Sequence, residues 1–362
     1  MAASSPTEDH SLGKRQHASR PTMFLACNRR AVIFLLVVCF VSAFVLYDGV
    51  YFFSPNGTLL YTIPLPARPT VATGNTTSTA TWAEVPSSES SRVRYNLTIV
   101  TAFLDIGQFG KGTPGNKRDH RIYEKWSSAY RLVHSPIVFY TDSPAFGRHI
   151  QHVRRHLPDL TRVVHVNRSQ LWSFQQKDKI AAIYKAGYPK HWPNTVYPDY
   201  TCVTHTKFEL VEDAILKGYY LSDHVVWMDA GYLRDKAGEA ANRSSSMYYV
   251  MEPPADFDPT RVMCGEIYQP NFNRGWRGIF RGNINWVGGG FFLGRVDLML
   301  KFVRQYTKAV GLFLELHESN VEQQVIYAMY TKEGRTIVHP EVELQAVRGG
   351  WFTLGLRCLV PH

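Results

Sequence analysis

The sequence predicts an α/β fold: a mixed, mainly parallel sheet flanked by helices, preceded by a transmembrane helix and a flexible stem. From Tyr95 onward, short apolar runs typical of strands alternate with segments of helical spacing, which is the order expected of a sheet covered by helices. Ahead of them, an uncharged apolar run is followed by a stretch rich in Ser, Thr and Pro. Of the 362 residues, 45% are hydrophobic and 13% aromatic, so we expect a sizeable core and no global disorder.

The N-terminal segment predicts a single-pass membrane anchor. Residues 1–30 are polar and mostly basic in their charges, and Ala31 to Tyr47 carry no charge. A run of this length is at the short end of what spans a bilayer, and its basic flank is expected to stay in the cytosol. A cleavable signal peptide, cut near Ser42, is the alternative, but the polar preamble is long for one. We therefore expect a cytosolic tail over 1–30, an anchor over 31–53 and a type II protein of the Golgi or endoplasmic-reticulum membrane.

Residues 54–93 predict a flexible stem, because they are rich in Ser, Thr, Pro and Ala and show little periodicity. A lumenal location agrees with the glycosylation sequons, all of which follow the apolar run. They begin at Asn56, Asn75, Asn96, Asn167 and Asn242. Beyond the anchor only Cys202, Cys264 and Cys358 remain, so at most one intramolecular disulfide is expected, and its pairing is open. The net charge of +10 favours anionic ligands, but a lumenal domain is not expected to meet nucleic acid.

The catalytic domain is expected over 94–362 and begins in β-α-β order. The first strand is "LTIVTAF" (Leu97 to Phe103), "RDHRIYEKWSSAYRLV" has helical spacing, "PIVFYTD" ends a second strand at Asp142, and "TRVVHV" gives a third. The helix "TKFELVEDAILKG" ends at Gly218, a natural cap, and leads into the strand "HVVWMDAG". Asp142 and Asp229 thus stand at strand ends, where open α/β sheets bind ligands, although either carboxylate can also cap a turn.

Two later segments add candidate site residues. In "NINWVGGGFFLGR", Gly288 to Gly290 predict a bulge or the close approach of a ligand, with a tight hairpin as the alternative. In "NRGWRGIFRGN", arginines stand beside aromatic residues, as in a clasp for a diphosphate, or else form a solvated basic loop. These arginines are Arg274, Arg277 and Arg281.

Glu322, near the start of the helix "VEQQVIYAMY", is a candidate general base. The other interpretation is a capping box, in which Ser319 and Glu322 satisfy backbone donors at the helix start. The two roles do not exclude each other.

These stretches resemble the HtrL/YibB-type family of glycosyltransferase-like proteins. The matching segments are "TIVTAFLDIG", "PIVFYTD", "THTKFELVEDAI", "VVWMDAG", "GGGFFLG" and "VEQQV", which together span most of residues 96–330. The resemblance implies a GT-A-like nucleotide-diphospho-sugar transferase fold. It also implies that Glu322 lies close to the reacting carbon and that other residues bind the nucleotide sugar. Those binding residues are Thr101, Ala102, Phe103 and Asp105 beside the nucleotide, Asp142 and Lys207 near its ribose and phosphates, and Gly289 and Gly290 under the sugar.

Asp229 takes the place of the metal-binding motif in this comparison. A GT-A Asp-x-Asp motif holds Mn²⁺ or Mg²⁺ against the diphosphate, but here Gly231 stands where the second acid belongs. We expect Asp229 to bind the cation singly, with water and the diphosphate completing its shell. Otherwise the three arginines around Trp276 take the diphosphate, and Asp229 holds a ribose or sugar hydroxyl.

The expected function is transfer of a sugar from a nucleotide-sugar donor to a lumenal glycan or glycoconjugate acceptor, with Asp229 and Glu322 as catalytic residues. One alternative is an inactive, lectin-like relative that binds glycans through Trp276 and Trp286; in a transferase, Trp286 is the expected acceptor contact. The other is a lumenal hydrolase that uses Asp229 as acid or nucleophile. A homodimer, the donor, the acceptor and the stereochemistry stay open.

Overall fold

The computed structural model describes residues 42–46, 49–53, 59–64, 93–112, 116–241 and 247–362. The chain divides into two compact units, Met1–Val85 and Pro86–His362. In the first unit, three antiparallel strands form a sheet in the order β1-β2-β3. Their bounds are β1 (Ser42–Leu46), β2 (Gly49–Phe53) and β3 (Leu59–Pro64).

The predicted membrane anchor, residues 31–53, falls within this first unit. Its residues 31–41 and 47–48 lie outside the described ranges, as does the predicted tail over 1–30. The described remainder forms β1 and β2 where we expected helix, in keeping with the strand preference of its valines and aromatic residues. None of the helices in the described part of the chain has the length and apolar character needed to cross a membrane. Of the predicted stem, only β3 and Val93 are described.

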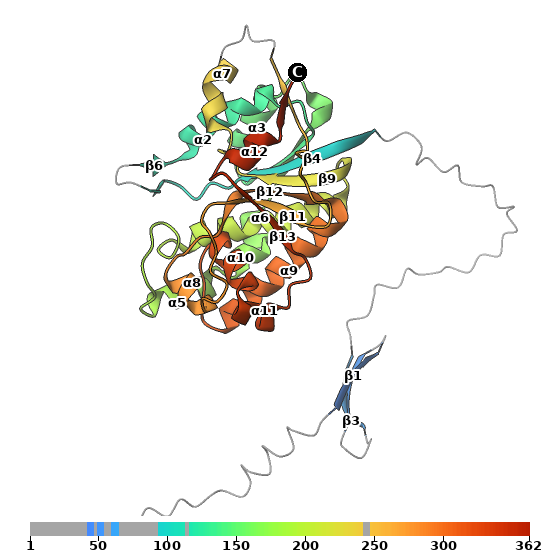
Figure 1. The fold of residues 1–362 in the computed structure, drawn as a ribbon, viewed down its shortest axis with the longest axis vertical. Helices are drawn as coiled ribbons and strands as arrows, with labels where there is room; N and C mark the ends of the chain where they lie inside the picture. Colours follow the sequence, from blue (N-terminus) through green and yellow to red (C-terminus); the bar gives the residue numbers. More distant parts are fainter. Residues whose placement is uncertain (1–41, 47–48, 54–58, 65–92, 113–115, 242–246) are drawn as a thin grey trace, which may run out of the picture. The chain divides into compact units, whose positions relative to one another are not determined.

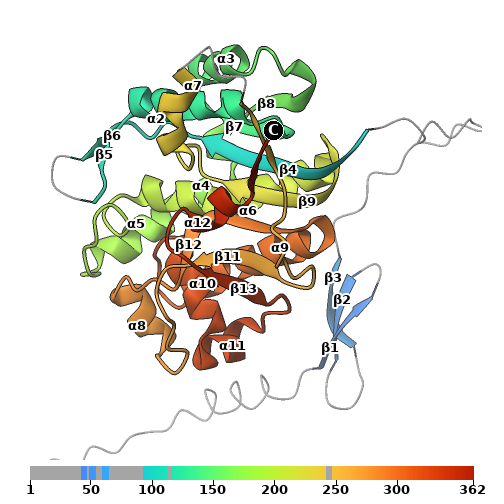
Figure 2. The same cartoon turned by 45° about the horizontal axis from the view of Figure 1, so that its top comes forward.

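The second unit is built on a mainly parallel seven-stranded sheet with the order β13-β11-β12-β9-β4-β7-β8. Strand β12 runs antiparallel to both its neighbours, and the other six strands share one direction. Figure 2 shows β7 and β8 toward one edge of this sheet and β11 and β13 toward the other. The bounds are β4 (Arg94–Phe103), β7 (Ile137–Thr141), β8 (Thr161–His165), β9 (Leu221–Met228), β11 (Val262–Glu266), β12 (Val287–Arg295) and β13 (Leu344–Arg348).

Helices cover both faces of this sheet (Figure 1). One face packs against α5, α6 and α8 to α11, and the other packs against α3, α12 and the 3-10 helix η2. The helix bounds are α2 (His120–Ser127), η2 (Ser128–Leu132), α3 (Pro144–Val153), η3 (Pro158–Leu160), η4 (Arg168–Gln170), α4 (Trp172–Gln175), α5 (Lys177–Lys185), α6 (Pro198–Lys217), η5 (Arg234–Lys236), α7 (Ala237–Ala241), α8 (Trp276–Arg281), α9 (Val296–Glu315), α10 (Glu322–Tyr330), α11 (Lys332–Val338) and α12 (Thr353–Arg357).

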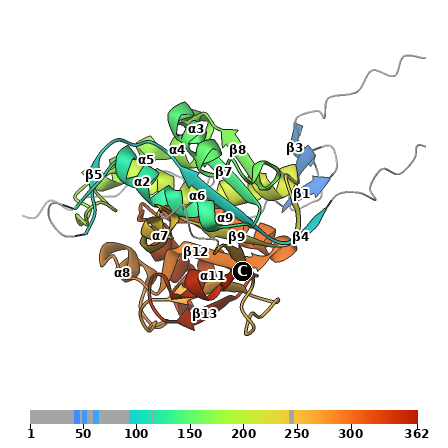
Figure 3. The same cartoon turned by 90° about the horizontal axis from the view of Figure 1, so that it is seen from above.

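Two small strand pairs complete the second unit. Strand β10 (Tyr249–Met251) pairs with β14 (Leu359–Pro361), and β5 (Phe109–Gly110) pairs with β6 (Lys117–Arg118), both antiparallel. Figure 3 shows β5 beside α2.

The central strands explain why the sequence reads as continuous apolar runs. In β9, Val225 and Trp227 belong to the core under α6 and α9, while Val226 and Met228 belong to the core on the opposite face. A strand covered on both faces has no polar side, so its sequence does not alternate. The predicted fold class is confirmed at this level: a mixed, mainly parallel sheet flanked by helices.

Most predicted elements of the second unit are present, with shifted ends. Helix α6 begins at Pro198, earlier than the apolar stripe indicated, and ends at Gly218, whose φ of 58° is the left-handed conformation that favours glycine. The predicted helix over 118–133 is divided into α2 and η2. Cys202, Cys264 and Cys358 are all buried and free, so the disulfide that the sequence allowed does not form among them.

Candidate functional site

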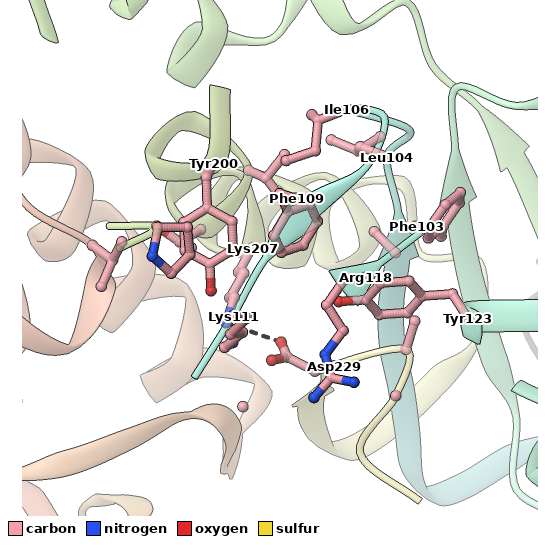
Figure 4. Close-up of a pocket in the computed structure, with 18 of the residues that line it drawn as sticks. Phe103, Leu104, Ile106, Phe109, Lys111, Arg118, Tyr123, Tyr200, Lys207 and Asp229 are labelled. Atoms are coloured by element: carbon pink, nitrogen blue, oxygen red, sulfur yellow. Dashed lines mark ion pairs between the residues drawn. The ribbon is translucent and has the colours of Figure 1, made fainter. Parts of the chain in front are cut away.

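A pocket of about 500 Å³ opens at the carboxyl ends of β4 and β9. Its wall also includes the N-terminal half of α6 and the N-terminal end of α10 with its N-cap. Because β12 is antiparallel to β9, the glycines at its beginning reach the same edge of the sheet. The charged side chains of the wall are Lys111, Arg118, Asp119, Lys207, Asp229, Arg234 and Glu322, several of which are seen in Figure 4.

Lys207 is the centre of this charged group. It lies two turns after Tyr200 on the face of α6 that lines the pocket. Its ammonium donates to the carbonyl of Gly289 (2.8 Å) and to Oε1 of Glu322 (2.9 Å), and it lies 2.9 Å from Oδ1 of Asp229. Burial lowers the pKa of a lysine, but the charges of Asp229 and Glu322 outweigh it and keep the pKa of Lys207 above its ordinary value. Lys207 is therefore cationic throughout the physiological range.

Asp229 follows β9 directly, as predicted, and forms an ion pair with Lys207 (Figure 4). Its Oδ1 also accepts a hydrogen bond from the indole of Trp227 (2.8 Å). The side chain is 41% exposed, so the carboxylate is open to the pocket. Burial of the carboxylate raises its pKa, but Lys207, Trp227 and Lys111 together lower it by more, so the pKa of Asp229 is below its ordinary value. The pocket thus holds an ionised carboxylate at neutral pH.

Glu322 lies at the same centre but is almost fully covered, with its side chain 5% exposed. Helix α10 begins at Glu322, and Val321 is its N-cap, so the predicted capping box with Ser319 does not form. The glutamate instead meets Lys207 through Oε1, while Oε2 is buried without a hydrogen-bond partner in the described part of the chain. A buried polar oxygen left without a partner is costly unless a ligand hydroxyl completes it.

The glycine run of β12 permits this arrangement. A Cβ added at Gly289 would lie 2.0 Å from Oε1 of Glu322 and 2.4 Å from its Cγ. The predicted close approach is therefore real, but it is made by the Glu322 side chain rather than by a ligand. Gly290 does line the pocket, and its carbonyl accepts the backbone N–H of Asp229 (2.9 Å).

The residues present do not fit a resident divalent cation. Oδ1 of Asp229 is held by Lys207 and Trp227. A Cβ at Gly231, the place of the missing acid, would lie 2.6 Å from the ring of Trp126, so no side chain fits there unless the tryptophan moves. Within the described ranges, no three His, Cys, Asp or Glu side chains are grouped as a metal site requires. The predicted single-aspartate metal site thus has a carboxylate already paired with an ammonium.

Three further cations line the pocket and were missed in the sequence. Lys111 lies over the ring of Tyr200 (5.4 Å), while Arg118 and Arg234 both lie against Trp126 (4.6 and 5.4 Å). Among the described residues, no carboxylate is within ion-pair distance of any of the three. Burial, together with the nearby charge of Arg118, lowers the pKa of Arg234. Cations that are not paired with a carboxylate can attract an anion into the pocket.

Aromatic side chains make up much of the remaining wall. The ring centroids of Phe109 and Tyr200 are 5.2 Å apart, and Figure 4 shows both side chains beside Lys207 and Lys111. Trp192 and Trp351 also line the pocket and are 65% and 43% exposed, so they offer faces to a ligand at the rim.

The first-strand residues of the prediction divide into two groups. Ala102 and Phe103 line the pocket, whereas Thr101 is buried and its hydroxyl lies 3.1 Å from that of Tyr130. Asp105 and Asp142 are outside the pocket wall and bound to each other, because the N–H of Asp105 donates to Oδ1 of Asp142 (2.8 Å). Asp142 also lies 3.4 Å from Arg168, so its role is to hold the loop after β4.

The predicted arginine clasp is not at the pocket. Arg274, Arg277 and Arg281 are exposed on or beside α8, outside the pocket wall. Arg281 pairs with Glu318 (2.9 Å), and Arg277 stacks on Trp276 (4.2 Å).

The predicted acceptor contact, Trp286, is also absent from the pocket wall. It is 6% exposed, and its indole N–H points to Glu266 (3.4 Å). Trp276, the other tryptophan of the lectin-like alternative, is 1% exposed, so both belong to the core. Of the sequons, Asn96 and Asn167 are exposed, while Asn56, Asn75 and Asn242 lie outside the described ranges.

Comparison with known proteins agrees with the sequence resemblance. No protein of curated function matches the chain. A family described as "Bacterial protein of unknown function (HtrL_YibB)" matches residues 95–359, which include every residue of the pocket wall. The family's description names no activity. The chain belongs to the HtrL/YibB family.

Proposed function

We propose that the protein is a glycosyltransferase of GT-A-like fold that transfers a sugar from a nucleotide-diphospho-sugar donor to a glycan or glycoconjugate acceptor. The supporting observation is the separation of charge within one pocket. Lys207 holds the carboxylates of Asp229 and Glu322, and the wall also contains Lys111, Arg118 and Arg234, which form no ion pair among the described residues. Such a pocket suits a ligand with a hydroxyl-rich part and a doubly charged part.

The size and lining of the pocket support a ligand of this class. Its volume of about 500 Å³ is within the range of small-molecule sites, and aromatic side chains such as Phe109 and Tyr200 are suited to a base or sugar ring. The pocket also lies at the carboxyl edge of a mainly parallel sheet, beside the antiparallel strand β12. Ligands of open α/β sheets bind at this edge.

The proposed reaction uses Asp229 as the base. Its carboxylate is ionised and open to the pocket, so it can accept the proton of the acceptor hydroxyl as that oxygen bonds to the sugar's anomeric carbon. The bond from that carbon to the diphosphate breaks, and the leaving nucleoside diphosphate carries the electron pair into the field of the cations. Glu322 positions Lys207 and therefore Asp229, and its unpartnered Oε2 is suited to hold a sugar hydroxyl.

We also propose the location that the sequence predicts, a type II protein of the Golgi or endoplasmic-reticulum membrane with this domain in the lumen. Its support is the basic flank, the uncharged run over 31–47 and the positions of the sequons.

A donor screen on the full-length chain tests the function. Nucleoside diphosphates and nucleotide sugars are titrated calorimetrically, and nucleotide release is measured with and without glycan acceptors. We expect one nucleoside diphosphate to bind and its sugar nucleotide to turn over when acceptor is added. Asp229→Asn keeps the side-chain shape and is expected to lower turnover by about 10²-fold or more, while Asp297→Asn, an exposed aspartate outside the pocket, leaves it unchanged.

Other results contradict the proposal in different ways. Glycan binding with no affinity for any nucleotide identifies a lectin-like protein. Donor breakdown at full rate without acceptor identifies a hydrolase.

A further inference from the structure

The position that a metal ion takes between two acidic groups is filled here by a side chain. The Lys207 ammonium lies 2.9 Å from Asp229 and 2.9 Å from Glu322. Mg²⁺ needs oxygen ligands at about 2.1 Å in octahedral geometry. To use Oδ2 of Asp229 it would bring two more positive charges close to a buried ammonium on the same carboxylate, and their repulsion opposes binding.

The position of the second acid of an Asp-x-Asp motif, here Gly231, is also unsuited to holding a metal ion. Gly231 leaves room for the ring of Trp126, whose face would collide with a Cβ at that position. That ring supports two guanidinium groups, those of Arg118 (4.6 Å) and Arg234 (5.4 Å), and Arg234 also lies over Phe352 (4.2 Å). An Asp-x-Asp motif has at this position a carboxylate that binds a metal cation. This chain instead has the ring of Trp126, which packs against the guanidinium groups of Arg118 and Arg234.

The side chains of the pocket wall are net positive without a metal. The wall carries four cations, Lys111, Arg118, Lys207 and Arg234, and three carboxylates, Asp119, Asp229 and Glu322, so it has an excess of one positive charge. The diphosphate of a nucleotide sugar carries two negative charges. Asp119, the other acidic residue of the wall, caps α2 by accepting the N–H of Ile122 (3.0 Å). A diphosphate entering the pocket therefore meets cations supplied by the chain itself.

We infer that the chain holds its donor's diphosphate with Lys111, Arg118 and Arg234 and needs no divalent cation. The inference rests on the proposed function and extends it to the way in which the leaving group is neutralised. Guanidinium groups pair with phosphate oxygens through two parallel hydrogen bonds, and stacking on Trp126 limits the orientations of both arginines before the ligand arrives. Lys111, over Tyr200, supplies the third charge.

Binding of inorganic pyrophosphate to the full-length chain tests this inference. Calorimetric titrations are made in excess EDTA and in millimolar Mg²⁺ or Mn²⁺, with the metal–pyrophosphate equilibrium included in the fit. We expect binding in EDTA, with an affinity for the free anion no more than about threefold below that in metal. Arg118→Gln, Arg234→Gln and Lys111→Gln are each expected to weaken it about tenfold or more, because each removes a charge-assisted hydrogen bond.

The matched control is Arg274→Gln, an exposed arginine outside the pocket wall, which is expected to bind like the parent chain. Circular dichroism of every variant separates loss of binding from loss of folding. Binding that requires Mg²⁺ or Mn²⁺ and is lost in Asp229→Asn overturns the inference and leaves the proposed function standing. Binding in EDTA that survives all three substitutions overturns the assignment of residues. No binding of pyrophosphate or of any nucleoside diphosphate, with or without metal, overturns the proposed function as well.

Discussion

Replacing Lys207 by methionine tests whether it is the cation on which the site depends. Methionine keeps an unbranched side chain of similar length but removes the charge shared by Asp229 and Glu322. Asp229 is 41% exposed and can turn to water, whereas Glu322 is 5% exposed and loses the one charged partner that it has among the described residues. Breaking a buried pair by removing one member costs about 3–5 kcal/mol. With a urea m-value of about 3 kcal/mol per molar, the unfolding midpoint should fall by about 1–1.7 M.

The pH dependence identifies the cause of this loss. In the parent chain the pKa of Asp229 is lowered, so its stabilisation is present above its unfolded value of 3.8 and is lost only as the pH falls through the lower folded value. The pKa of Lys207 is raised, so its contribution is complete below its unfolded value of 10.5. Neither changes between pH 5 and pH 8. In Lys207→Met, the uncompensated Glu322 is expected to take up a proton, which stabilises the variant as the pH falls.

The assay is urea unfolding of the full-length chain at pH 7.5 and pH 5, followed by tryptophan fluorescence. We expect the midpoint difference between parent and Lys207→Met to be large at pH 7.5 and smaller at pH 5. The control is Lys179→Met, which removes an exposed ion pair with Glu315 and should leave the midpoint unchanged. A difference as large at pH 5 as at pH 7.5 would indicate a packing defect and refute the electrostatic account.

Two further predictions concern the glycine run and the location of the domain. Gly289→Ala places a methyl group 2.0 Å from Oε1 of Glu322, so the glutamate must leave Lys207, and we expect turnover to fall at least about tenfold with nucleotide affinity little changed. The control is Gly311→Ala, whose added methyl group meets open space and should leave both turnover and affinity unchanged. Equal turnover in the two variants would contradict the role of Glu322. Endoglycosidase treatment of the protein from eukaryotic cells should increase its electrophoretic mobility, because Asn96 and Asn167 are exposed in sequons. If treatment does not change the mobility, and if the variants Asn96→Gln and Asn167→Gln migrate like the parent chain, the support for a lumenal domain is removed.

The parts of the fold that could be predicted are those determined by residues close together in the sequence. The strand that ends at Met228 is apolar on both faces, so its burial and the position of Asp229 at its end follow from a few residues. The same holds for α6, because its capping glycine and its apolar stripe are local signals. Lys207 came from the family resemblance, and nothing local indicated that its ammonium would be buried against two acids.

The direction and order of strands could not be predicted in this way. Strand β12 follows β11 in sequence, yet it inserts between β11 and β9 and runs antiparallel to both. This pairing depends on partners far away in the sequence, and it is what brings Gly289 and Gly290 to Asp229.

The position of Arg274, Arg277 and Arg281 outside the pocket wall could not be predicted for a related reason. A stretch of arginine, glycine and tryptophan shows which residues are present but not which of them face the core. In α8, Trp276 faces the core and the arginines face outward. Lys111 and Arg118 belong to or adjoin a two-residue strand pair, too short to read as an element. The glycines and basic residues of the stretch over 110–118 are the signal that the sequence offers for this part of the pocket.

The contacts of Lys207 also determine when, during folding, this protein can acquire its site. The ammonium meets a carbonyl 82 positions away and a carboxylate 115 positions away along the chain. Closing such long loops costs chain entropy that is recovered only once distant segments pack, so contacts of this span form late. A nascent chain that has not yet reached Val321 would bury a lysine against a single acid, with no helix α10 to complete the pair. The charged centre can therefore form only after the segments from α6 to α10 have packed together.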